Sequence, residues 1–312
     1  MRIAVVGAGG VGGYFGGRLA QGGSQVVFIA RGEHLDAMQT QGLRVESIKG
    51  NFTVSPVEAV DDPVKAGPVD AVLVCVKTWQ VPEAAQAIRP MLGAETFVVP
   101  LENGVDAPGE LAAVLGRERV LGGLCQISSS IVSPGVIRHV GIEPYVAIGE
   151  LDRRPSERAE RLRQAFEQSG VRVEIPDDIQ AAMWLKFLFI AVLGGVGGVT
   201  GVPVGVSRSL PETRQMLVDG LEEIYRLAKA REVDLPEEAV DKTLAFIDSL
   251  PPGTMASMQR DILDGRPSEL ESQNGAIVRM GKESGVETPL HAFLYSSLLP
   301  KELRARGQLE FS

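Results

Sequence analysis

Short apolar runs alternate with helical patterns through the first half of the chain. The runs with strand character are Arg2–Val6, Gln25–Ala30, Ala71–Val76 and Thr96–Pro100. The helical patterns are Val11–Gln21, Val81–Leu92 and Ala107–Leu115. Because continuous apolar strands that alternate with helices are typical of a parallel sheet covered on both faces, this half predicts a doubly wound α/β domain.

Beyond Val120 the pattern becomes more β-like. Two stretches, Ile131–Val140 and Pro144–Ile148, are predicted to be antiparallel additions to the sheet. A charged pattern at Ser156–Ser169 predicts a solvated helix with i,i+4 ion pairs, and Val171–Ile175 predicts a last short strand.

Long helical patterns dominate the chain from Ile179 onward. They are Ile179–Val192, Pro211–Arg231, Pro236–Ser249, Glu269–Ser284 and His291–Leu303. The change of character places a domain boundary near Pro176-Asp177-Asp178. We therefore expect an α/β domain over residues 1–177 and an all-helical domain over residues 178–312. The helices at Pro211–Arg231 and His291–Leu303 either form a homodimer contact or belong to the core.

The stretch Phe187–Ser207 carries no charged residue and is long enough to span a bilayer. Seven glycine and proline residues interrupt it: Gly194, Gly195, Gly197, Gly198, Gly201, Pro203 and Gly205. A buried helix followed by a glycine-rich turn therefore explains it better than a membrane span. The N-terminal apolar segment runs straight into a glycine turn, so it does not fit a signal peptide.

Charge and cysteine content narrow the function classes. A net charge of −9 argues against nucleic-acid binding, because an acidic surface repels phosphate backbones. The two cysteines, Cys75 and Cys125, form no disulfide framework and fit buried thiols in a reducing cytoplasm. The three histidines, His34, His139 and His291, have no metal-ligand spacing, so we predict no metal site.

The turn after the first predicted strand has the sequence Gly7-Ala8-Gly9-Gly10-Val11-Gly12, which matches GxGxxG between a strand and a helix. In such a turn, Gly7 permits the sharp bend and Gly9 lets the backbone approach a pyrophosphate. Gly12 lets the helix pack close to the strand. The pyrophosphate then meets free N–H groups at the positive end of the helix dipole. The first domain is therefore predicted to be a Rossmann-like dinucleotide-binding domain.

Arg31 follows the second predicted strand, about 20 residues beyond the glycines. An NAD site usually has Asp or Glu there, and a carboxylate would repel a 2′-phosphate. A guanidinium can instead bind the phosphate with paired charge-assisted hydrogen bonds. We therefore predict NADPH as the cofactor; Glu33, on the following turn, is a weaker ribose ligand.

Further segments occur in a distinctive order along the chain. They are Cys75-Val76-Lys77-Thr78-Trp79-Gln80, Leu101-Glu102-Asn103-Gly104, Met183-Trp184-Leu185-Lys186, Met255-Ala256-Ser257-Met258, Asp261, Gly265-Arg266, Glu269 and Asn274-Gly275. Together with the glycine turn, this series resembles the ketopantoate reductase (2-dehydropantoate 2-reductase) family over nearly the whole chain. The resemblance implies a Rossmann domain, a helical domain, and an active site in the cleft between them. It also implies reduction of a 2-keto acid with NADPH, as in pantothenate biosynthesis.

The resemblance also implies roles for particular residues. Lys186 aligns with the general acid, and Lys77 and Asn103 with cofactor-side and substrate-side positions. Ser257 and Glu269 align with substrate contacts, and Glu269 is also a predicted catalytic residue that pairs with Lys186 or orients the hydroxyl group of the substrate. The chemistry is consistent, because an ammonium can stabilise the charge that develops on a ketone oxygen and then donate a proton.

Each of these residues also has a purely structural interpretation. Lys186 could snorkel at a helix edge, Lys77 could be solvated, and Asn103-Gly104 could be a simple turn. Ser257 could cap a helix, and Glu269 could interact with a helix dipole.

Two positions depart from the family pattern. The helix that carries the lysine normally has an asparagine one turn later and often another polar residue after a further turn. Here these positions are Ile190 and Gly194. We therefore expect a more apolar and roomier pocket beside Lys186. A different 2-keto acid or carbonyl compound is one alternative substrate, since an apolar site discriminates weakly. A non-catalytic NADP(H)-binding sensor and a nucleotide-sugar or methyl-transfer enzyme of the same fold are further alternatives.

Overall fold

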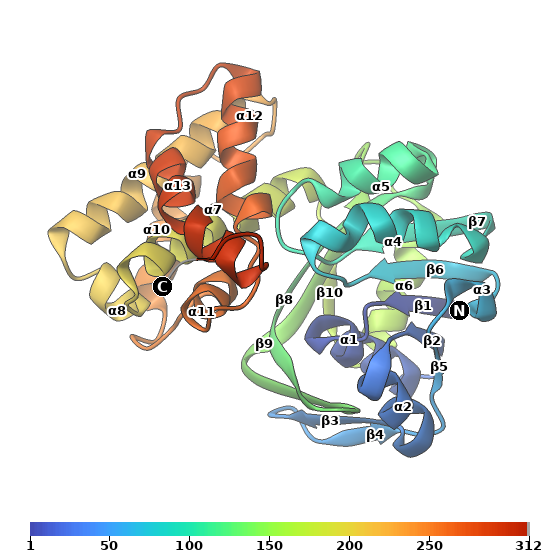
Figure 1. The fold of residues 1–312 in the computed structure, drawn as a ribbon. Helices are drawn as coiled ribbons and strands as arrows, with labels where there is room; N and C mark the ends of the chain where they lie inside the picture. The colour runs from blue at the N-terminus through green and yellow to red at the C-terminus, as the bar shows by residue number, and fades with distance from the viewer. Residues whose placement is uncertain (311–312) are drawn as a thin grey trace. The chain divides into compact units, whose positions relative to one another are not determined.

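A computed structural model describes residues 1–310, which form two units (Figure 1). The first contains Met1–Glu102 and Ala107–Ala182. The second contains Asn103–Asp106 and the chain from Met183 onward. Helix α7 (Ile179–Thr200) begins in the first unit and continues into the second. The division thus falls inside this helix, a few residues after the boundary expected near Pro176-Asp177-Asp178.

A five-stranded parallel sheet forms the centre of the first unit. Its order is β5-β2-β1-β6-β7. The strands are β1 (Arg2–Val6), β2 (Gln25–Ile29), β5 (Glu58–Val60), β6 (Val69–Val74) and β7 (Leu92–Pro100). The predicted doubly wound sheet is confirmed, with β1 at its centre. Strands β1 and β6 are neighbours across the point where the strand order reverses, which is where this fold binds ligands.

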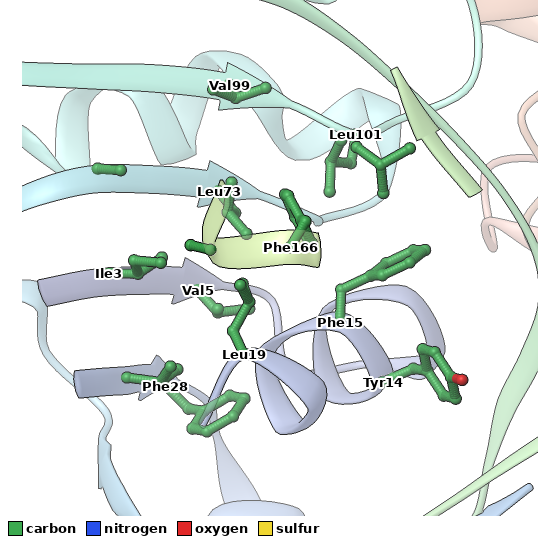
Figure 2. Close-up of a cluster of buried hydrophobic side chains, with 14 of the residues drawn as sticks. Ile3, Val5, Tyr14, Phe15, Leu19, Phe28, Leu73, Val99, Leu101 and Phe166 are labelled. Carbon is green, nitrogen blue, oxygen red and sulfur yellow. The ribbon is translucent and has the colours of Figure 1, made fainter. Parts of the chain in front are cut away.

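Side chains of β1 alternate between two buried layers. Ile3 and Val5 pack with Phe15 and Leu19 of helix α1 (Gly10–Gln21), and Phe166 joins the same layer (Figure 2). The intervening residues of β1 pack on the opposite face with helices α4 (Val81–Ala87) and α5 (Ala107–Leu115). Burial on both faces explains why these strands are continuous apolar runs in the sequence.

A second sheet in the first unit was only partly predicted. Strands β8 (Leu121–Ser133) and β9 (Val136–Glu150) pair antiparallel. The predicted strand Ile131–Val140 is wrong, because the chain reverses inside it at Pro134-Gly135, where Gly135 has φ +74°. The addition is also not purely antiparallel: β3 (Leu43–Ser47) and β10 (Arg172–Glu174) lie parallel to β9, and β4 (Phe52–Val54) lies antiparallel to β3.

Short helices complete the first unit. They are α2 (Gly32–Gln41), α3 (Pro63–Ala66), η1 (Thr78–Gln80), η2 (Arg89–Met91), η3 (Arg117–Arg119) and α6 (Glu157–Gln168). The predicted charged helix is confirmed as α6, which begins where the Ser156 hydroxyl accepts a hydrogen bond from the Ala159 amide.

The second unit is helical, as predicted. After α7 its helices are α8 (Val204–Ser207), α9 (Pro211–Ala230), α10 (Ala239–Ser249), α11 (Ser257–Leu263), the π-helix η4 (Glu271–Gly275), α12 (Ala276–Ser284) and α13 (Pro289–Ala305). Helices α9 and α13 pack together, and five of their leucines are buried within the unit: Leu217, Leu221, Leu227, Leu294 and Leu298. One face of each helix therefore belongs to the core.

The expected glycine-rich turn after Val192 is wrong, because α7 runs unbroken to Thr200. Its glycines lie where other helices approach closely: a Cβ on Gly195 would be 2.7 Å from the Asn274 amide, and one on Gly198 would be 3.1 Å from Leu298. Helix–helix packing therefore outweighs the low helix propensity of glycine. Within residues 1–310, α7 is the one helix long and apolar enough to cross a membrane, and two-thirds of its most apolar window (67%) is buried inside the protein.

Each of the three histidines contacts polar groups of the protein. Gly135 N–H donates to His34 Nδ1, and His139 lies between Ser47 Oγ and the Ile142 carbonyl. His291 lies 2.7 Å from the buried Glu223 carboxylate. Among the residues described, no three His, Cys, Asp or Glu side chains cluster as metal ligands.

Candidate functional site

The glycine turn after β1 has the geometry that a bound pyrophosphate requires. Gly7 has φ +93°, and a Cβ there would lie 2.7 Å from the Cys75 carbonyl oxygen. A Cβ on Gly9 would meet nothing within 4 Å, so the space above it is open. Gly9 is also the N-cap of α1, and no side chain caps it. The open helix start fits the phosphates of a dinucleotide.

The other glycines of the turn serve close packing. A Cβ on Gly12 would overlap the Gly7 carbonyl oxygen and lie 2.9 Å from Val5 Cγ1. A Cβ on Gly10 would lie 2.5 Å from the carbonyl oxygen of Ser129 on β8. The turn therefore combines one open glycine with glycines that permit helix α1 to contact its neighbours.

The carboxyl ends of β1, β6 and β7 are held in register beside the turn. Cys75 N–H donates to the Val6 carbonyl at 2.8 Å, and Leu101 N–H donates to the Val74 carbonyl at 2.9 Å. Burial, assisted by the nearby Glu102 carboxylate, raises the pKa of the Cys75 thiol well above its ordinary value. This partly buried cysteine is therefore a packing residue rather than a reactive thiolate.

Two cationic side chains lie at this edge of the first unit. Lys77 is exposed, with its ammonium 5.8 Å from the centre of the Trp79 ring. The Arg31 side chain is 75% exposed, and its guanidinium lies 3.7 Å from the Glu83 carboxylate. A long, solvated ion pair of this kind is weak, so Arg31 can be recruited by a stronger anion. Glu33 lies in the first turn of α2.

In the second unit, two predicted site residues are hydrogen-bonded. Asn103 Nδ2 donates to Glu269 Oε2 at 2.9 Å, although the residues are 166 positions apart. The Glu269 side chain is buried. The carboxylate of Glu269 thereby accepts a fixed amide donor, which determines its orientation.

The segment Asn103–Asp106 contacts the rest of the second unit at more than one point. Gly104 has φ +98°, and a Cβ there would lie 3.1 Å from the Ser272 carbonyl oxygen. Asp106 accepts a 3.5 Å hydrogen bond from Arg279. Burial raises the pKa of Asp106, and the positive charges of Arg279 and Arg231 oppose that rise. Asn103-Gly104 is thus a turn, but one whose amide side chain also binds Glu269.

Ser268, the residue before Glu269, is hydrogen-bonded to Glu302 of helix α13 and to Arg306 at its end. The Glu302 carboxylate accepts hydrogen bonds from the Ser268 amide at 3.0 Å and from the Ser268 hydroxyl at 2.5 Å. Arg306 donates to the Ser268 carbonyl at 3.0 Å and also binds Glu302. The backbone leading into Glu269 is therefore held on both its N–H and C=O sides. Glu269 lies just before the π-helix Glu271–Gly275, and its carbonyl accepts a hydrogen bond from Gln273 N–H at 3.0 Å, so it stands at the start of a helical segment as its structural interpretation expects.

Lys186 and Ser257 lie on α7 and α11 of the same unit. Lys186 is half-buried, and beside it Trp184 and Phe187 form an edge-to-face pair with ring centres 5.7 Å apart. Ser257 is exposed and is the first residue of α11. The capping interpretation of Ser257 is wrong, because Ala256 occupies the N-cap position.

The expectation of a roomier pocket is wrong at Gly194. A Cβ there would lie 2.9 Å from Met258 Cε and 3.5 Å from Gln273 Oε1, so neighbouring side chains already fill the space. Gln273 was missed in the sequence, where it stands inside what looks like an ordinary helical pattern. Its amide Nε2 lies 3.5 Å from Glu269 Oε2, which places it beside the predicted site.

Comparison with known proteins covers both units. The family model described as ketopantoate reductase PanE/ApbA matches residues 3–153, and the model for its C-terminal part matches residues 178–302. The chain is 29% identical over 300 residues to the uncharacterized oxidoreductase YkpB of Bacillus subtilis, covering 96% of this chain and 98% of that protein. It is 28% identical over 314 residues to the 2-dehydropantoate 2-reductase of Nostoc, covering 99% and 98%.

Solved structures share the fold over nearly the same length. The PanE/ApbA family ketopantoate reductase of Ralstonia eutropha is 30% identical, with a TM-score of 0.90, and the match covers 98% of this chain and all (100%) of that one. A D-mandelate dehydrogenase solved with NADH and anilino(oxo)acetate is 24% identical, with a TM-score of 0.87 and coverage of 98% and 99%. The latter likeness demonstrates the fold alone.

Proposed function

The chain belongs to the ketopantoate reductase family, and on that premise we propose that it reduces a 2-keto acid to a 2-hydroxy acid with NADPH. The proposed substrate is 2-dehydropantoate, which would place the reaction in pantothenate biosynthesis. The Asn103–Glu269 hydrogen bond carries this proposal. It presents an oriented carboxylate in the unit that also contains Lys186 and Ser257.

The residues of the chain fit a reduced dinucleotide. The open space above Gly9 accommodates a pyrophosphate, and the neighbouring residues Ala8, Gly10 and Val11 line the start of α1. Arg31 and Lys77 supply positive charge at the same edge of the sheet. When bound, NADPH supplies the hydride that the reaction consumes.

We assign the proton chemistry to Lys186. Hydride addition to C2 of the keto acid leaves a negative charge on the former carbonyl oxygen. The Lys186 ammonium stabilises this charge and transfers a proton to the oxygen, so the product is a neutral hydroxyl group. Glu269, held by Asn103, orients the substrate through a hydrogen bond, and the exposed Ser257 hydroxyl donates to the substrate carboxylate.

A panel of substrates tests the proposed function. Purified protein is incubated with NADPH and each of several 2-keto acids, and the loss of NADPH absorbance gives kcat/KM. We expect 2-dehydropantoate to have the highest value. A higher value for a bulkier or less polar 2-keto acid would favour the alternative of a different keto acid. Tight NADPH binding with no turnover of any carbonyl compound would instead favour a sensor.

Arg31→Ala tests the choice of cofactor. We expect the Kd for NADPH to rise roughly 10- to 100-fold, because a charge-assisted contact with the 2′-phosphate is lost. The Kd for NADH should stay within about twofold, since NADH lacks this phosphate. Arg154→Ala is the matched control, because Arg154 is an exposed arginine paired only with Asp152 in the described contacts. Equal weakening of both cofactors by Arg31→Ala, or tighter NADH binding by the unmodified protein, would refute the assignment.

A further inference from the structure

A buried hydrogen-bond acceptor lies beside Glu269 and has no partner among the described residues. Gln273 is 1% exposed, and its Oε1 atom accepts no hydrogen bond. The other end of the amide, Nε2, lies 3.5 Å from Glu269 Oε2. A buried carbonyl oxygen without a donor costs stability, so its retention calls for an explanation. The π-helix Glu271–Gly275 that carries Gln273 is a type of distortion often found at functional sites.

The unpartnered oxygen faces the helix that carries Lys186. It lies 3.5 Å from the position that a Cβ on Gly194 would occupy. Lys186, Ile190 and Gly194 follow one another at intervals of four residues, so they share one face of α7. The chain has no polar side chain at the last two of these positions. Gln273, on the π-helix Glu271–Gly275, therefore places a polar group against this face of α7.

The neighbouring amide serves a different purpose. Asn274 Nδ2 donates to the Ala191 carbonyl at 3.3 Å, and a Cβ on Gly195 would lie 2.7 Å from it. Asn274 is thus bound to the backbone of α7 through Nδ2, although its buried Oδ1, like Gln273 Oε1, has no partner among the described residues. Among the described contacts, the Gln273 amide makes no hydrogen bond to α7. Its one hydrogen bond there is the 3.5 Å contact from Nε2 to Glu269 Oε2.

We propose that Gln273 is a specificity-determining substrate contact, whose Oε1 accepts a hydrogen bond from a hydroxyl group on the far end of the keto acid. This assignment rests on the proposed function. An amide oxygen can only accept, so the ligand must bring an O–H or N–H donor. A site that offers a buried acceptor rejects an analogue without the donor, because the acceptor then stays unpaired.

The distances along α7 are compatible with one small substrate. Eight residues of helix separate Lys186 from Gly194, or about 12 Å. A small substrate can span this length. It needs a hydrogen bond of roughly 2.8 Å at each end, a short carbon chain between the two, and the length of the lysine side chain. Met258 Cε covers Gly194, and methionine, with its flexible thioether, can move aside for a ligand.

Two keto acids with the same carbon skeleton test the assignment. 2-Dehydropantoate carries a terminal hydroxyl group, and 3,3-dimethyl-2-oxobutanoate is the same molecule without it. We expect the unmodified protein to favour the hydroxylated compound at least 100-fold in kcat/KM. Gln273→Met retains the side-chain volume but removes the acceptor. It should lower this preference at least tenfold, mainly by slowing the hydroxylated substrate.

Gln259 provides a matched control. It is also 1% exposed and also lies against a glycine of α7, since a Cβ on Gly197 would be 2.5 Å from its Oε1. Its amide is bound to the protein, because Nε2 donates to the Val202 carbonyl at 2.9 Å. Gln259→Met should lower Tm and leave the preference between the two keto acids unchanged.

The outcomes separate this assignment from the proposed function. Turnover of both keto acids with the same preference before and after Gln273→Met would overturn the assignment alone, as would equal slowing of both substrates. An unmodified protein that does not distinguish the two compounds would also overturn it, and this measurement does not depend on the folding of any variant. Absence of turnover on every 2-keto acid would refute the proposed function and, with it, the role of Gln273.

Discussion

Replacing Lys186 by methionine should lower kcat for the preferred keto acid by about 10²- to 10⁴-fold, the usual contribution of a general acid. The Kd for NADPH should stay within about twofold, because Lys186 is assigned to the substrate oxygen rather than to the cofactor. Methionine keeps an unbranched side chain of similar length, so α7 should fold as before. Steady-state kinetics and titration of NADPH binding measure the two quantities separately.

Two further variants identify the cause of that loss. Lys186→Arg keeps the positive charge, but a guanidinium does not give up its proton. It should therefore recover only the part of the rate that comes from charge stabilisation. Lys282→Met, at an exposed lysine of α12, should leave kcat unchanged. If Lys186→Met retained kcat within about threefold, the lysine would have only a packing role.

The variant Gly9→Ala should fold normally and bind NADPH roughly 100-fold more weakly, a loss of about 2.7 kcal/mol. The added methyl group meets no atom within 4 Å, and the Gly9 backbone at φ −71° and ψ −159° suits alanine. The methyl group would instead occupy the space through which a pyrophosphate approaches the backbone. Thermal unfolding and titration with NADPH distinguish stability from binding.

Two other glycines of the first unit provide contrasting controls. Gly12→Ala should lower stability by at least 1–3 kcal/mol, because its Cβ overlaps the Gly7 carbonyl oxygen and crowds Val5. Gly109→Ala, in α5, meets nothing within 4 Å and should leave stability unchanged or raise it by about 0.5–1 kcal/mol. Unaltered NADPH affinity in Gly9→Ala would exclude the space above Gly9 as the pyrophosphate site.

Local sequence patterns were enough to predict a strand where the segment is buried in the same way along its whole length. The strands β1, β2, β6 and β7 are continuous apolar runs because the sheet is covered on both faces, and that pattern is visible in the sequence. The hairpin β8–β9 was predicted poorly, because β-prone residues continue on both sides of its turn at Pro134-Gly135. Pairing of β9 with β3 and β10 involves segments distant in sequence and leaves no local signal.

Glycine residues led to a correct prediction in the turn after β1 and to a wrong one in α7. In the turn after β1, its spacing alone indicated a dinucleotide site, because the motif reflects local backbone geometry. In α7, the same residue type was predicted to end a helix, yet the helix continues through Gly194, Gly195, Gly197 and Gly198. There the glycines accommodate side chains such as Gln259 and Asn274, which approach from other helices. Only tertiary packing distinguishes the two uses.

Local sequence patterns were sufficient to predict the doubly wound sheet, the helical second half and the glycine turn, and they also supplied the polar residues proposed for the candidate site. Each depends on neighbours within one or two turns of the chain. Three contacts became visible in the folded chain alone: Asn103 binds Glu269, Glu302 of α13 binds Ser268, and Gln273 faces Gly194. These contacts join positions more than thirty residues apart, and their geometry depends on how whole helices pack, which no local pattern records.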